Sequence, residues 1–320
     1  MLAALAAAVL LAGGYDDGHL LFSFADPRIT ESSGLVAAAR SDLLFTHNDS
    51  GDVARFFAVD RAGRTRAVFG LTGVQARDWE DISGGPGRTL WLGDIGDNSA
   101  TRDRGLLVHR VAEPTLASPR TLTPTTYRLR YDDGPKDAEA LLVTAAGRPL
   151  IVEKTLGTTA RVYAPDLPLR PGGAVNLLHV VAEVHVPVVT GGDISPDGHH
   201  LVLRNYTAAY EWDIPGDDVI AALADEPTRI ALPSTAQGEG IAYSRDSRSL
   251  LTSSEGVGAP VYELRRTNRT TASTAASPAR PTPPPEVARD RPGGWRLPLT
   301  AAGLLLLGGV ILTAIRHRRS

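Results

Sequence analysis

The stretch "RDWEDI" (77–82) places three carboxylates within the four residues before one apolar residue. Polar segments that end in one apolar residue occur five times in the chain. They are "ESSGL" ending at Leu35, "DWEDI" at Ile82, "DAEAL" at Leu141, "TGGDI" at Ile194 and "QGEGI" at Ile241. Their spacings of 47, 59, 53 and 47 residues predict an array of similar supersecondary units.

Each segment is followed by a turn signal and two short apolar runs, and four of the five units add a fourth run. Short strands joined by turn residues at even spacing are typical of all-β folds. The fifth unit stops after "VYELRR" (261–266), and "HLLFSF" (His19–Phe24) can supply the strand that it lacks. We therefore predict a five-bladed β-propeller over residues 15–266, closed by an N-terminal strand. A six-bladed propeller is the alternative if Arg161–Val189 holds an extra blade.

The acidic loop residues are expected to share one face of this propeller. In a propeller, the connections between blades and the loops between second and third strands open on the same side. Those segments hold most of the acidic loop residues, Asp137 included, whereas the hairpins of the other face hold plain turns such as "PDG" and "AAG". The residues predicted to bind a ligand at the acidic mouth are Asp49, Asp78, Glu80, Asp94, Asn98, Asp193 and Glu239.

The position two residues before the aligned apolar residue carries three carboxylates, in the series Ser33, Glu80, Glu139, Gly192 and Glu239. Like charges that converge on an axis do not stay ionised without a cation or hydrogen-bond donors. Carboxylates are the hard oxygen ligands that Ca²⁺ prefers, so Glu80, Glu139 and Glu239 are the candidate metal ligands and Ca²⁺ the candidate cofactor. The alternative is that these side chains cap loops and accept hydrogen bonds from backbone N–H groups.

A second interpretation is metal-dependent hydrolysis. A Lys–Arg pair beside carboxylates can hold an oxyanion while a bound metal activates water. The signatures G-x-S-x-G and H-E-x-x-H, which mark common serine hydrolases and zinc proteases, are absent from the sequence. The candidate catalytic residues are Glu139, Glu153, Lys154, Arg204 and His47.

Composition limits the partners of the chain. Its formal net charge is −3 at pH 7, which argues against nucleic acid, because proteins that bind it are usually strongly basic. The sequence has no Cys, so disulfide scaffolds, Cys metal sites and thiol nucleophiles are excluded.

Both ends of the sequence predict export and membrane attachment. Residues 1–14, "MLAALAAAVLLAGG", resemble a signal peptide. Residues 267–296 are rich in Thr, Ser, Ala and Pro and predict an extended stalk. Residues 297–315 form an uncharged apolar run long enough to cross a bilayer, and residues 316–320 carry three Arg, as expected of a cytoplasmic tail.

We therefore expect a single C-terminal transmembrane helix in the cell membrane, with the propeller outside the cell. The motif "LPLTA" (297–301) is similar to a sortase cell-wall sorting signal, with Ala301 where that signal normally has Gly. Attachment to the cell wall is thus the alternative to a membrane anchor.

The segments "SSGL", "THNDSGD", "DWEDI", "GDIGDN", "DAEAL" and "GGDISPDG" together resemble exported actinobacterial propeller proteins of largely unknown function. They are also distantly similar to phytase-like and SMP-30/strictosidine-synthase-type propellers. The resemblance covers about residues 30–265 and implies a propeller fold. "DAEAL" is similar to the D-x-E-G element of the phytase-like group, except that Ala140 replaces its Gly.

The sequence thus favours a membrane-anchored extracellular propeller that binds a ligand or a protein partner, with Ca²⁺ as candidate cofactor, at an acidic axial face. A metal-dependent phosphoester or ester hydrolase of the phytase-like type is the alternative function. A stalked interaction scaffold without chemistry is the third.

Overall fold

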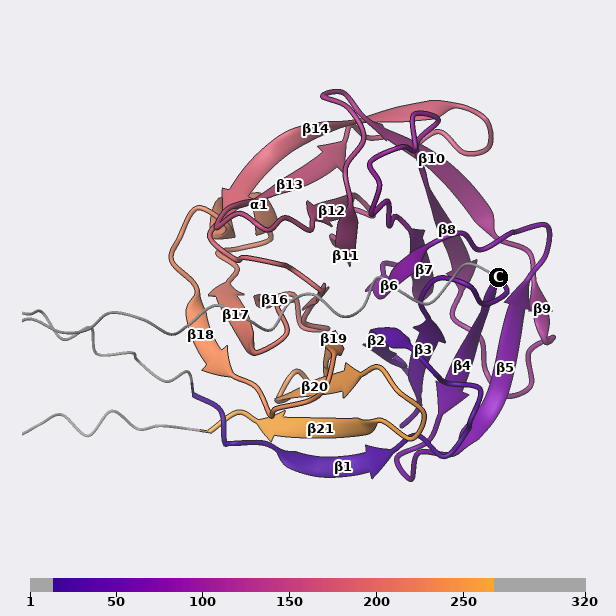
Figure 1. Cartoon of the computed structure of the whole chain (residues 1–320), viewed down its shortest axis with the longest axis vertical. Helices are drawn as coiled ribbons and strands as arrows, with labels where there is room; N and C mark the ends of the chain where they lie inside the picture. Colours follow the sequence, from indigo (N-terminus) through magenta and orange to yellow (C-terminus); the bar gives the residue numbers. More distant parts are fainter. Residues whose placement is uncertain (1–13, 268–320) are drawn as a thin grey trace, which may run out of the picture. The chain divides into compact units, whose positions relative to one another are not determined.

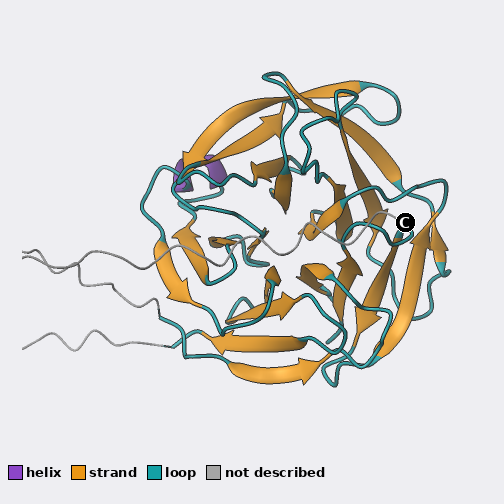
Figure 2. Cartoon of the chain, viewed as in Figure 1, coloured by secondary structure: helices purple, strands orange, loops and turns teal. Residues whose placement is uncertain are grey.

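The computed structural model describes residues 14–267, which form 21 β-strands and one four-residue helix. Figures 1 and 2 show short sheets arranged around a central axis, with the helix α1 (Val219–Ala222) at the periphery. The described part of the chain is therefore all-β apart from this helix, as predicted.

The first repeat unit forms a sheet with the strand order β2-β3-β4-β5-β9. Strand β9 is only two residues long and runs parallel to β5, whereas the other neighbours are antiparallel. The strands are β2 (Ser32–Ala37), β3 (Leu44–Asn48), β4 (Arg55–Val59), β5 (Thr65–Leu71) and β9 (Thr121–Leu122).

The second and third repeat units are joined in one eight-stranded sheet. Each half is antiparallel, and the halves meet at a parallel pairing of β10 with β14, in which Arg128 lies opposite Val175. One half contains β6 (Trp79–Gly85), β7 (Thr89–Asp94), β8 (Leu106–Ala112) and β10 (Thr125–Tyr131). The other contains β11 (Ala138–Val143), β12 (Pro149–Glu153), β13 (Ala160–Pro165) and β14 (Val175–Val184).

The last two units are four-stranded sheets. One contains β15 (Gly191–Ile194), β16 (His200–Arg204), β17 (Ala208–Asp213) and β18 (Thr228–Ala231). The other contains β19 (Gly238–Tyr243), β20 (Ser249–Ser254), β21 (Pro260–Arg265) and β1 (His19–Ser23). Strand β1 pairs antiparallel with β21, which confirms the closing N-terminal strand. This pairing removes an open sheet edge.

The five innermost strands form a closed ring. β2 contacts β6, β6 contacts β11, β11 contacts β15, β15 contacts β19, and β19 contacts β2. Figure 1 shows β2, β6, β11 and β19 nearest the centre, with later strands such as β5, β14, β18 and β1 further out. Each of these strands begins at one of the aligned sequence segments, so the sequence period corresponds to successive sheets of a propeller-type arrangement.

Two aspartates join neighbouring units through backbone hydrogen bonds. Asp81 in β6 accepts from its neighbour Ile82 N at 2.8 Å and from Leu141 N in β11 at 2.9 Å. Asp193 in β15 does the same with Ile194 N at 2.9 Å and with Tyr243 N in β19 at 2.8 Å. Because their oxygens accept backbone N–H groups, these aspartates hold adjacent inner strands together.

Several sequence predictions concern residues outside the described range. The signal segment, most of the stalk, the transmembrane helix, the cytoplasmic tail and the "LPLTA" motif fall within 1–13 or 268–320, except for Gly14 and Thr267. Among residues 14–267, no helix is long and apolar enough to cross a membrane.

Candidate functional site

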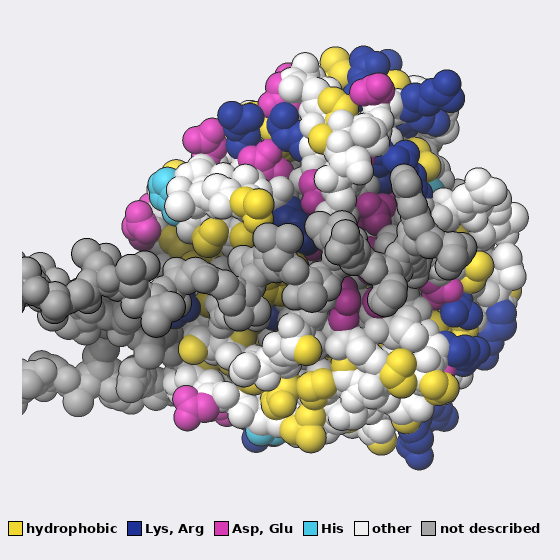
Figure 3. All heavy atoms as spheres, viewed as in Figure 1, with side chains coloured by type: hydrophobic (Ala, Val, Ile, Leu, Met, Phe, Trp, Pro, Cys, Tyr) yellow, Lys and Arg dark blue, Asp and Glu magenta, His cyan; other side chains and the backbone are white. Residues whose placement is uncertain are grey.

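The candidate site lies at the start of three inner strands. Glu80, Glu139 and Glu239 are each the second residue of their strand, in β6, β11 and β19. All three side chains are buried. Figure 3 shows acidic side chains in magenta near the middle of the face that it presents.

A β-bulge precedes the aligned apolar residue in these strands. The pairing register shifts between Trp79 and Asp81 in β6, between Ala138 and Ala140 in β11, and between Gly238 and Ile241 in β19. A bulge re-aims the side chain that it carries, so each glutamate leaves the ordinary in-and-out alternation of its strand. Strand β15 pairs without such a shift and has Gly192 at the equivalent position.

Two overlapping groups of carboxylates could each hold a cation. One contains Asp49, Asp78 and Glu80, and the other contains Glu80, Asp137 and Glu139. Within each group, one oxygen from every residue lies within 4.8 Å of the others. Glu80 belongs to both groups and is therefore the centre of the acidic cluster, the name used below for these five residues.

Glu239 lies outside both groups, so the expected triad of Glu80, Glu139 and Glu239 is only partly assembled. Glu239 Oε1 accepts a hydrogen bond from Gln237 Nε2 at 3.1 Å, and the same amide donates to Glu255 Oε1 at 2.7 Å. The repulsion from Glu239 still helps to raise the pKa of Glu139, so Glu239 lies beside the acidic cluster.

Asp137 belongs to the acidic cluster, although it is not among the residues that the sequence predicted to bind a ligand or a metal. A repeated Asp-x-Glu spacing could have found it, because Asp78 precedes Glu80 by two residues and Asp137 precedes Glu139 by two. Gln237 is the residue two positions before Glu239. The fifth unit, whose glutamate lies outside both carboxylate groups, therefore has an amide where the second and third units have a carboxylate.

Gly96, in the loop after β7, makes room for the acidic cluster. A Cβ atom at this position would overlap Glu80 Oε1 and lie 2.6 Å from Asp78 Oδ2. The backbone of the "GDIGDN" loop therefore approaches the two carboxylates closely because residue 96 has no side chain.

Burial and, to a smaller extent, mutual repulsion raise the pKa values of four members of the acidic cluster, Glu80, Glu139, Asp49 and Asp78. Burial is the main cause of the rise for Glu80, well above the usual range, and Glu139 and Asp49 add to it. The pKa of Asp49 rises to about 7, and that of Asp78 also rises, again chiefly through burial. These groups are held near one another with little positive charge to compensate them.

Lys154, the residue after β12, is the cation that pairs with the cluster. Its ammonium forms an ion pair with Glu139 Oε1 and lies 5.8 Å from the centre of the Tyr206 ring. Burial still raises the pKa of Glu139 to about 8, against the lowering effect of Lys154. Glu139 Oε2 is buried and has no hydrogen-bond partner among the described residues.

Replacing Lys154 by methionine should raise the pKa of Glu139 by at least about one unit, because the nearest positive charge is lost. Carboxyl ¹³C chemical shifts in a pH titration would measure the change. Lys136→Met is the matched control, since Lys136 pairs with Asp133 at 3.4 Å rather than with the cluster. An unchanged Glu139 titration in Lys154→Met would contradict the assignment of this ion pair.

Arg204 does not face the cluster as a free cation, contrary to its candidate catalytic role. It is buried, and its guanidinium donates to the backbone oxygens of Gly240 at 3.0 Å, Ser253 at 3.3 Å and Asn205 at 3.1 Å. Gly238 leaves the space that the guanidinium occupies. Burial lowers the pKa of Arg204 to about 10, and the side chain links β16 to β19 and β20.

His47 and Glu153 also lie outside both carboxylate groups. His47 is fully buried, with Nδ1 2.9 Å from Asn48 O and its ring 5.7 Å from the Trp79 ring in an edge-on contact. Burial lowers the pKa of His47 to about 4, so it is a neutral core residue at pH 7. Glu153 Oε1 accepts from Arg161 N at 2.9 Å and so belongs to the pairing with β13.

The remaining predicted ligand residues, Asp94, Asp193 and Asn98, lie outside both carboxylate groups. Asp94 is buried, pairs with Arg102 at 2.8 Å and accepts from the backbone of Asp78 at 3.2 Å, which orders the segment that carries Asp78. Asp193 is one of the two aspartates that join neighbouring units. Asn98 is exposed. The capping alternative therefore holds for Asp94 and Asp193.

The fold and the site together define an all-β protein of propeller type with a partly buried acidic cluster where its inner strands begin. No family model matches the chain, and no curated protein sequence matches it.

Similar solved structures include the PQQ-bound form of an aldose sugar dehydrogenase from Streptomyces coelicolor, with 12% identity and a TM-score of 0.45 over 77% of this chain and 96% of that chain. A gluconolactonase from Xanthomonas campestris shares 12% identity, with a TM-score of 0.46 over 80% of this chain and 99% of that chain. A putative gluconolactonase shares 14% identity, with a TM-score of 0.43 over 80% of this chain and 93% of that chain. At these values the likeness concerns the arrangement of the backbone, and no activity is transferred from it. Membership of an exported actinobacterial group stays a prediction.

Proposed function

We propose that this chain is a five-bladed propeller whose acidic cluster binds Ca²⁺ and, through it, an oxygen-rich extracellular ligand or protein partner. The observation that carries the proposal is the uncompensated state of the cluster. Four carboxylates lie around that of Glu80, in two groups that share it, one ammonium reaches the cluster, and Glu139 Oε2 is buried without a partner among the described residues.

The blade count rests on the ring of inner strands. Five inner strands contact one another in turn. Each begins a unit of four antiparallel strands if the eight-stranded sheet is divided at its parallel β10–β14 pairing, and the two-residue β9 is an addition to the first unit. The six-bladed alternative needed an additional unit within Arg161–Val189. That segment supplies most of β13 and all of β14, which belong to the third unit.

Ca²⁺ fits the donors better than a softer transition metal. Both groups offer only carboxylate oxygens, and Ca²⁺ takes six to eight oxygen ligands at flexible geometry, whereas imidazole and thiolate select other metals. A cation at Glu80 could use the carboxylates of either group and leave remaining positions for water or for oxygens of a bound ligand. The proposal therefore concerns a binding module in which metal and ligand share one site.

A Ca²⁺ titration of the full chain tests this function. After treatment with EDTA, saturating Ca²⁺ should raise the Tm by about 5 °C or more, because a ligand at 100 times its Kd stabilises the folded state by ~2.7 kcal/mol. Glu80→Gln should weaken Ca²⁺ binding at least about tenfold, since it removes the carboxylate that both groups share.

The exposed Glu226 provides the matched control. Glu226→Gln should bind Ca²⁺ as the unmodified chain does. A Tm that does not change when Ca²⁺ is added, or a Glu80→Gln variant that binds Ca²⁺ with unchanged affinity, would overturn the proposal.

Metal-dependent phosphoester or ester hydrolysis is the second candidate, and the position of Lys154 favours it. An ammonium beside a carboxylate-bound metal could hold an oxyanion while the metal activates water. The other candidate catalytic residues add nothing here, because Arg204, His47 and Glu153 have the structural partners described above. Ca²⁺-dependent turnover of p-nitrophenyl phosphate or p-nitrophenyl acetate that is lost in Lys154→Ala would select this function, and no turnover would leave the binding module.

The location follows from the sequence alone and is part of the proposal. A span over residues 297–315 and a stalk over residues 267–296 would hold the propeller outside the cell membrane. The "LPLTA" motif keeps attachment to the cell wall as the alternative.

A further inference from the structure

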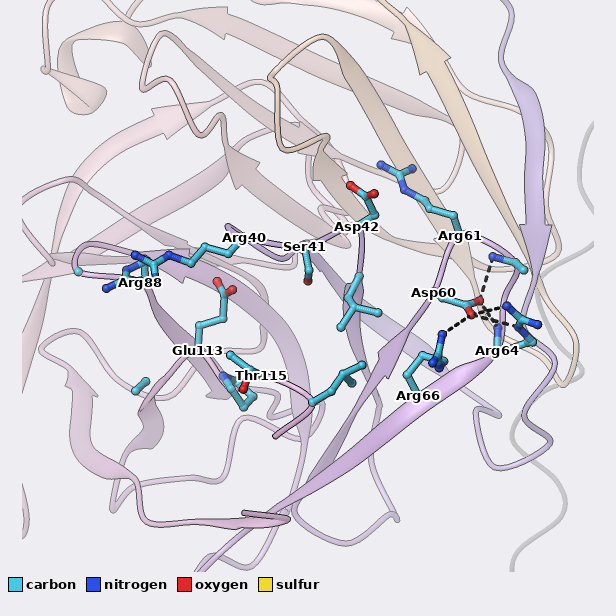
Figure 4. A pocket seen from close by; sticks show the side chains of 16 residues that line it. Arg40, Ser41, Asp42, Asp60, Arg61, Arg64, Arg66, Arg88, Glu113 and Thr115 are labelled. Atoms are coloured by element: carbon cyan, nitrogen blue, oxygen red, sulfur yellow. Dashed lines mark hydrogen bonds and ion pairs between the residues drawn. The ribbon is translucent and has the colours of Figure 1, made fainter. Parts of the chain in front are cut away.

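A cavity lies among hairpin turns at the opposite ends of the inner strands from the acidic cluster. It has a volume of about 830 Å³ and is lined by the β2–β3, β4–β5 and β6–β7 turns together with the segment after β8. Figure 4 shows this cavity and its charged side chains. None of the cluster residues lines it.

Five arginines and three acids line this pocket, called the arginine pocket below. The arginines are Arg40, Arg61, Arg64, Arg66 and Arg88, and the acids are Asp42, Asp60 and Glu113. The lining thus carries two more positive than negative charges, five minus three.

The acids of the arginine pocket are already engaged. Asp60 pairs with Arg64 at 3.0 Å and Arg66 at 3.3 Å. Asp42 pairs with Arg245, which lies outside the pocket lining, at 3.2 Å.

Glu113 accepts a backbone hydrogen bond from Ala39 N, at 3.2 Å to Oε1 and 3.0 Å to Oε2. Among the described residues, Arg40, Arg61 and Arg88 have no ion-pair partner within 4.0 Å. Three guanidinium groups are therefore left to face the cavity and solvent.

Two of these arginines lie near Glu113, whose N donates to Arg88 O at 3.0 Å and whose carboxylate accepts from Ala39 N, next to Arg40. In the view of Figure 4, the side chains of Arg40, from the β2–β3 turn, and Arg88, from the β6–β7 turn, lie toward the same end of the pocket, and Arg61 lies further along, toward Asp42. Two guanidinium groups that converge repel each other unless an anion lies between or before them. The carboxylate of Glu113 provides only one negative charge for the pair.

Apolar side chains line the remainder of the arginine pocket. Leu43, Ala112, Pro114 and Leu116 belong to the lining. Leu116 is 41% exposed, so it can cover an apolar body that enters the cavity. A purely inorganic anion would leave this part of the surface unused, and a neutral apolar ligand would leave the arginines unused.

We propose that the arginine pocket binds an organic phosphate, with the phosphate group at Arg40 and Arg88 and an apolar body on Leu43, Pro114 and Leu116. The planar guanidinium group donates two parallel hydrogen bonds to phosphate oxygens. A phosphate monoester carries nearly two negative charges at pH 7 and so matches two arginines, whereas a carboxylate would match one.

The binding of phenyl phosphate to the full chain, measured by isothermal titration calorimetry in EDTA, tests this proposal. EDTA removes divalent cations, so the result does not depend on metal at the acidic cluster. We expect phenyl phosphate to bind and phenol to bind much more weakly. The double variant Arg40→Gln/Arg88→Gln should weaken the affinity at least about tenfold, because it removes two charge-assisted contacts.

Two further variants sharpen the test. Glu113→Gln should tighten phenyl phosphate binding about threefold, since it removes the negative charge that competes for the two arginines. Arg229→Gln, on the exposed outer strand β18 and away from the pocket lining, is the control and should bind as the unmodified chain does.

The source of the phosphate is distinguished by vesicles. Stronger binding of the chain to vesicles of phosphatidylcholine with phosphatidic acid than to pure phosphatidylcholine, with the difference lost in the double variant, would identify a lipid headgroup as the ligand. Binding of phenyl phosphate without such a difference between the vesicles would identify a soluble organic phosphate. Neither kind of binding, an affinity for inorganic phosphate equal to that for phenyl phosphate, or an equal loss in Arg229→Gln would each overturn the proposal.

Discussion

Replacing Glu211 by alanine is expected to lower the free energy of unfolding by about 3 kcal/mol, because it breaks a partly buried ion pair and leaves two tyrosine hydroxyls and an arginine without their acceptor. Glu211 lies in β17 and is 7% exposed. Its Oε1 accepts from Tyr15 OH at 2.7 Å and Tyr243 OH at 2.8 Å, and Arg266 pairs with it at 2.7 Å. Urea unfolding of the variant would measure the loss.

The effect is large because two partners of Glu211, Tyr15 and Arg266, lie near opposite ends of the described chain. Tyr15 precedes β1, Arg266 follows β21, and the two residues form an isolated backbone bridge. One carboxylate in the fourth unit therefore holds both ends of the described chain against the closing sheet. The sequence has no Cys, so non-covalent contacts close the ring, and weakening this one favours opening of the β1–β21 pairing.

Two comparisons make this prediction specific. Tyr15→Phe removes one hydroxyl and should lower the free energy of unfolding by about 1 kcal/mol. In the double variant with Glu211→Ala the losses should be less than additive, since both act on one hydrogen-bonded network. The exposed Glu226→Ala is the control. Additive losses, or a Glu211→Ala variant as stable as this control, would contradict the assignment.

The sequence predicted the inner strands well because their signals are local. Each apolar residue such as Ile82 or Leu141 is followed by turn residues and another apolar run, and both are fully buried in the structure. The contacts that the sequence could not show join distant segments. The parallel pairing of β10 with β14 and the short strand β9 leave no periodic pattern in the sequence.

The site was predicted in part for a similar reason. The repeated acid placed Glu80 and Glu139 together, because equivalent positions of neighbouring units lie side by side in a ring. Which way each side chain points depends on the bulges at the start of the inner strands, and alternation along a strand does not reveal a bulge. For Arg204, the sequence showed a cation near the mouth, whereas backbone oxygens of the next unit hold it in the structure.

The free energy of unfolding of the metal-free chain should fall by at least about 3 kcal/mol between pH 7 and pH 9, because the folded state retains about one proton that the unfolded chain releases. Burial raises the pKa of Glu139 to about 8 and that of Glu255 to about 9, and that of Glu80 well above its usual range. A group whose pKa is raised on folding stabilises the folded state fully below its unfolded pKa, near 4 for these acids, and that stability is lost as the pH rises through the folded pKa.

Above pH 7 the change in stability with pH reports the buried carboxylates and not the buried histidines. Burial lowers the pKa values of His47 and His109 to about 4. The stability linked to these histidines therefore changes between about pH 4 and pH 6.5 and is constant above pH 7. Urea unfolding at pH 7, 8 and 9 in EDTA should show the decline, and Glu80→Gln should reduce it, because the substitution removes one of the acids that must ionise.

Calcium should reverse the direction of this dependence. Ca²⁺ binds ionised carboxylates, so raising the pH strengthens its binding to the folded chain while it weakens the metal-free fold. With saturating Ca²⁺ the free energy of unfolding should therefore stay level or rise from pH 7 to pH 9. A free energy of unfolding that rises with pH in EDTA would show that the folded chain stabilises these carboxylates in their charged form without a metal ion. If stability declines with pH in EDTA and Ca²⁺ does not change that decline, the raised pKa values of the buried acids are supported, and Ca²⁺ binding at the acidic cluster is contradicted.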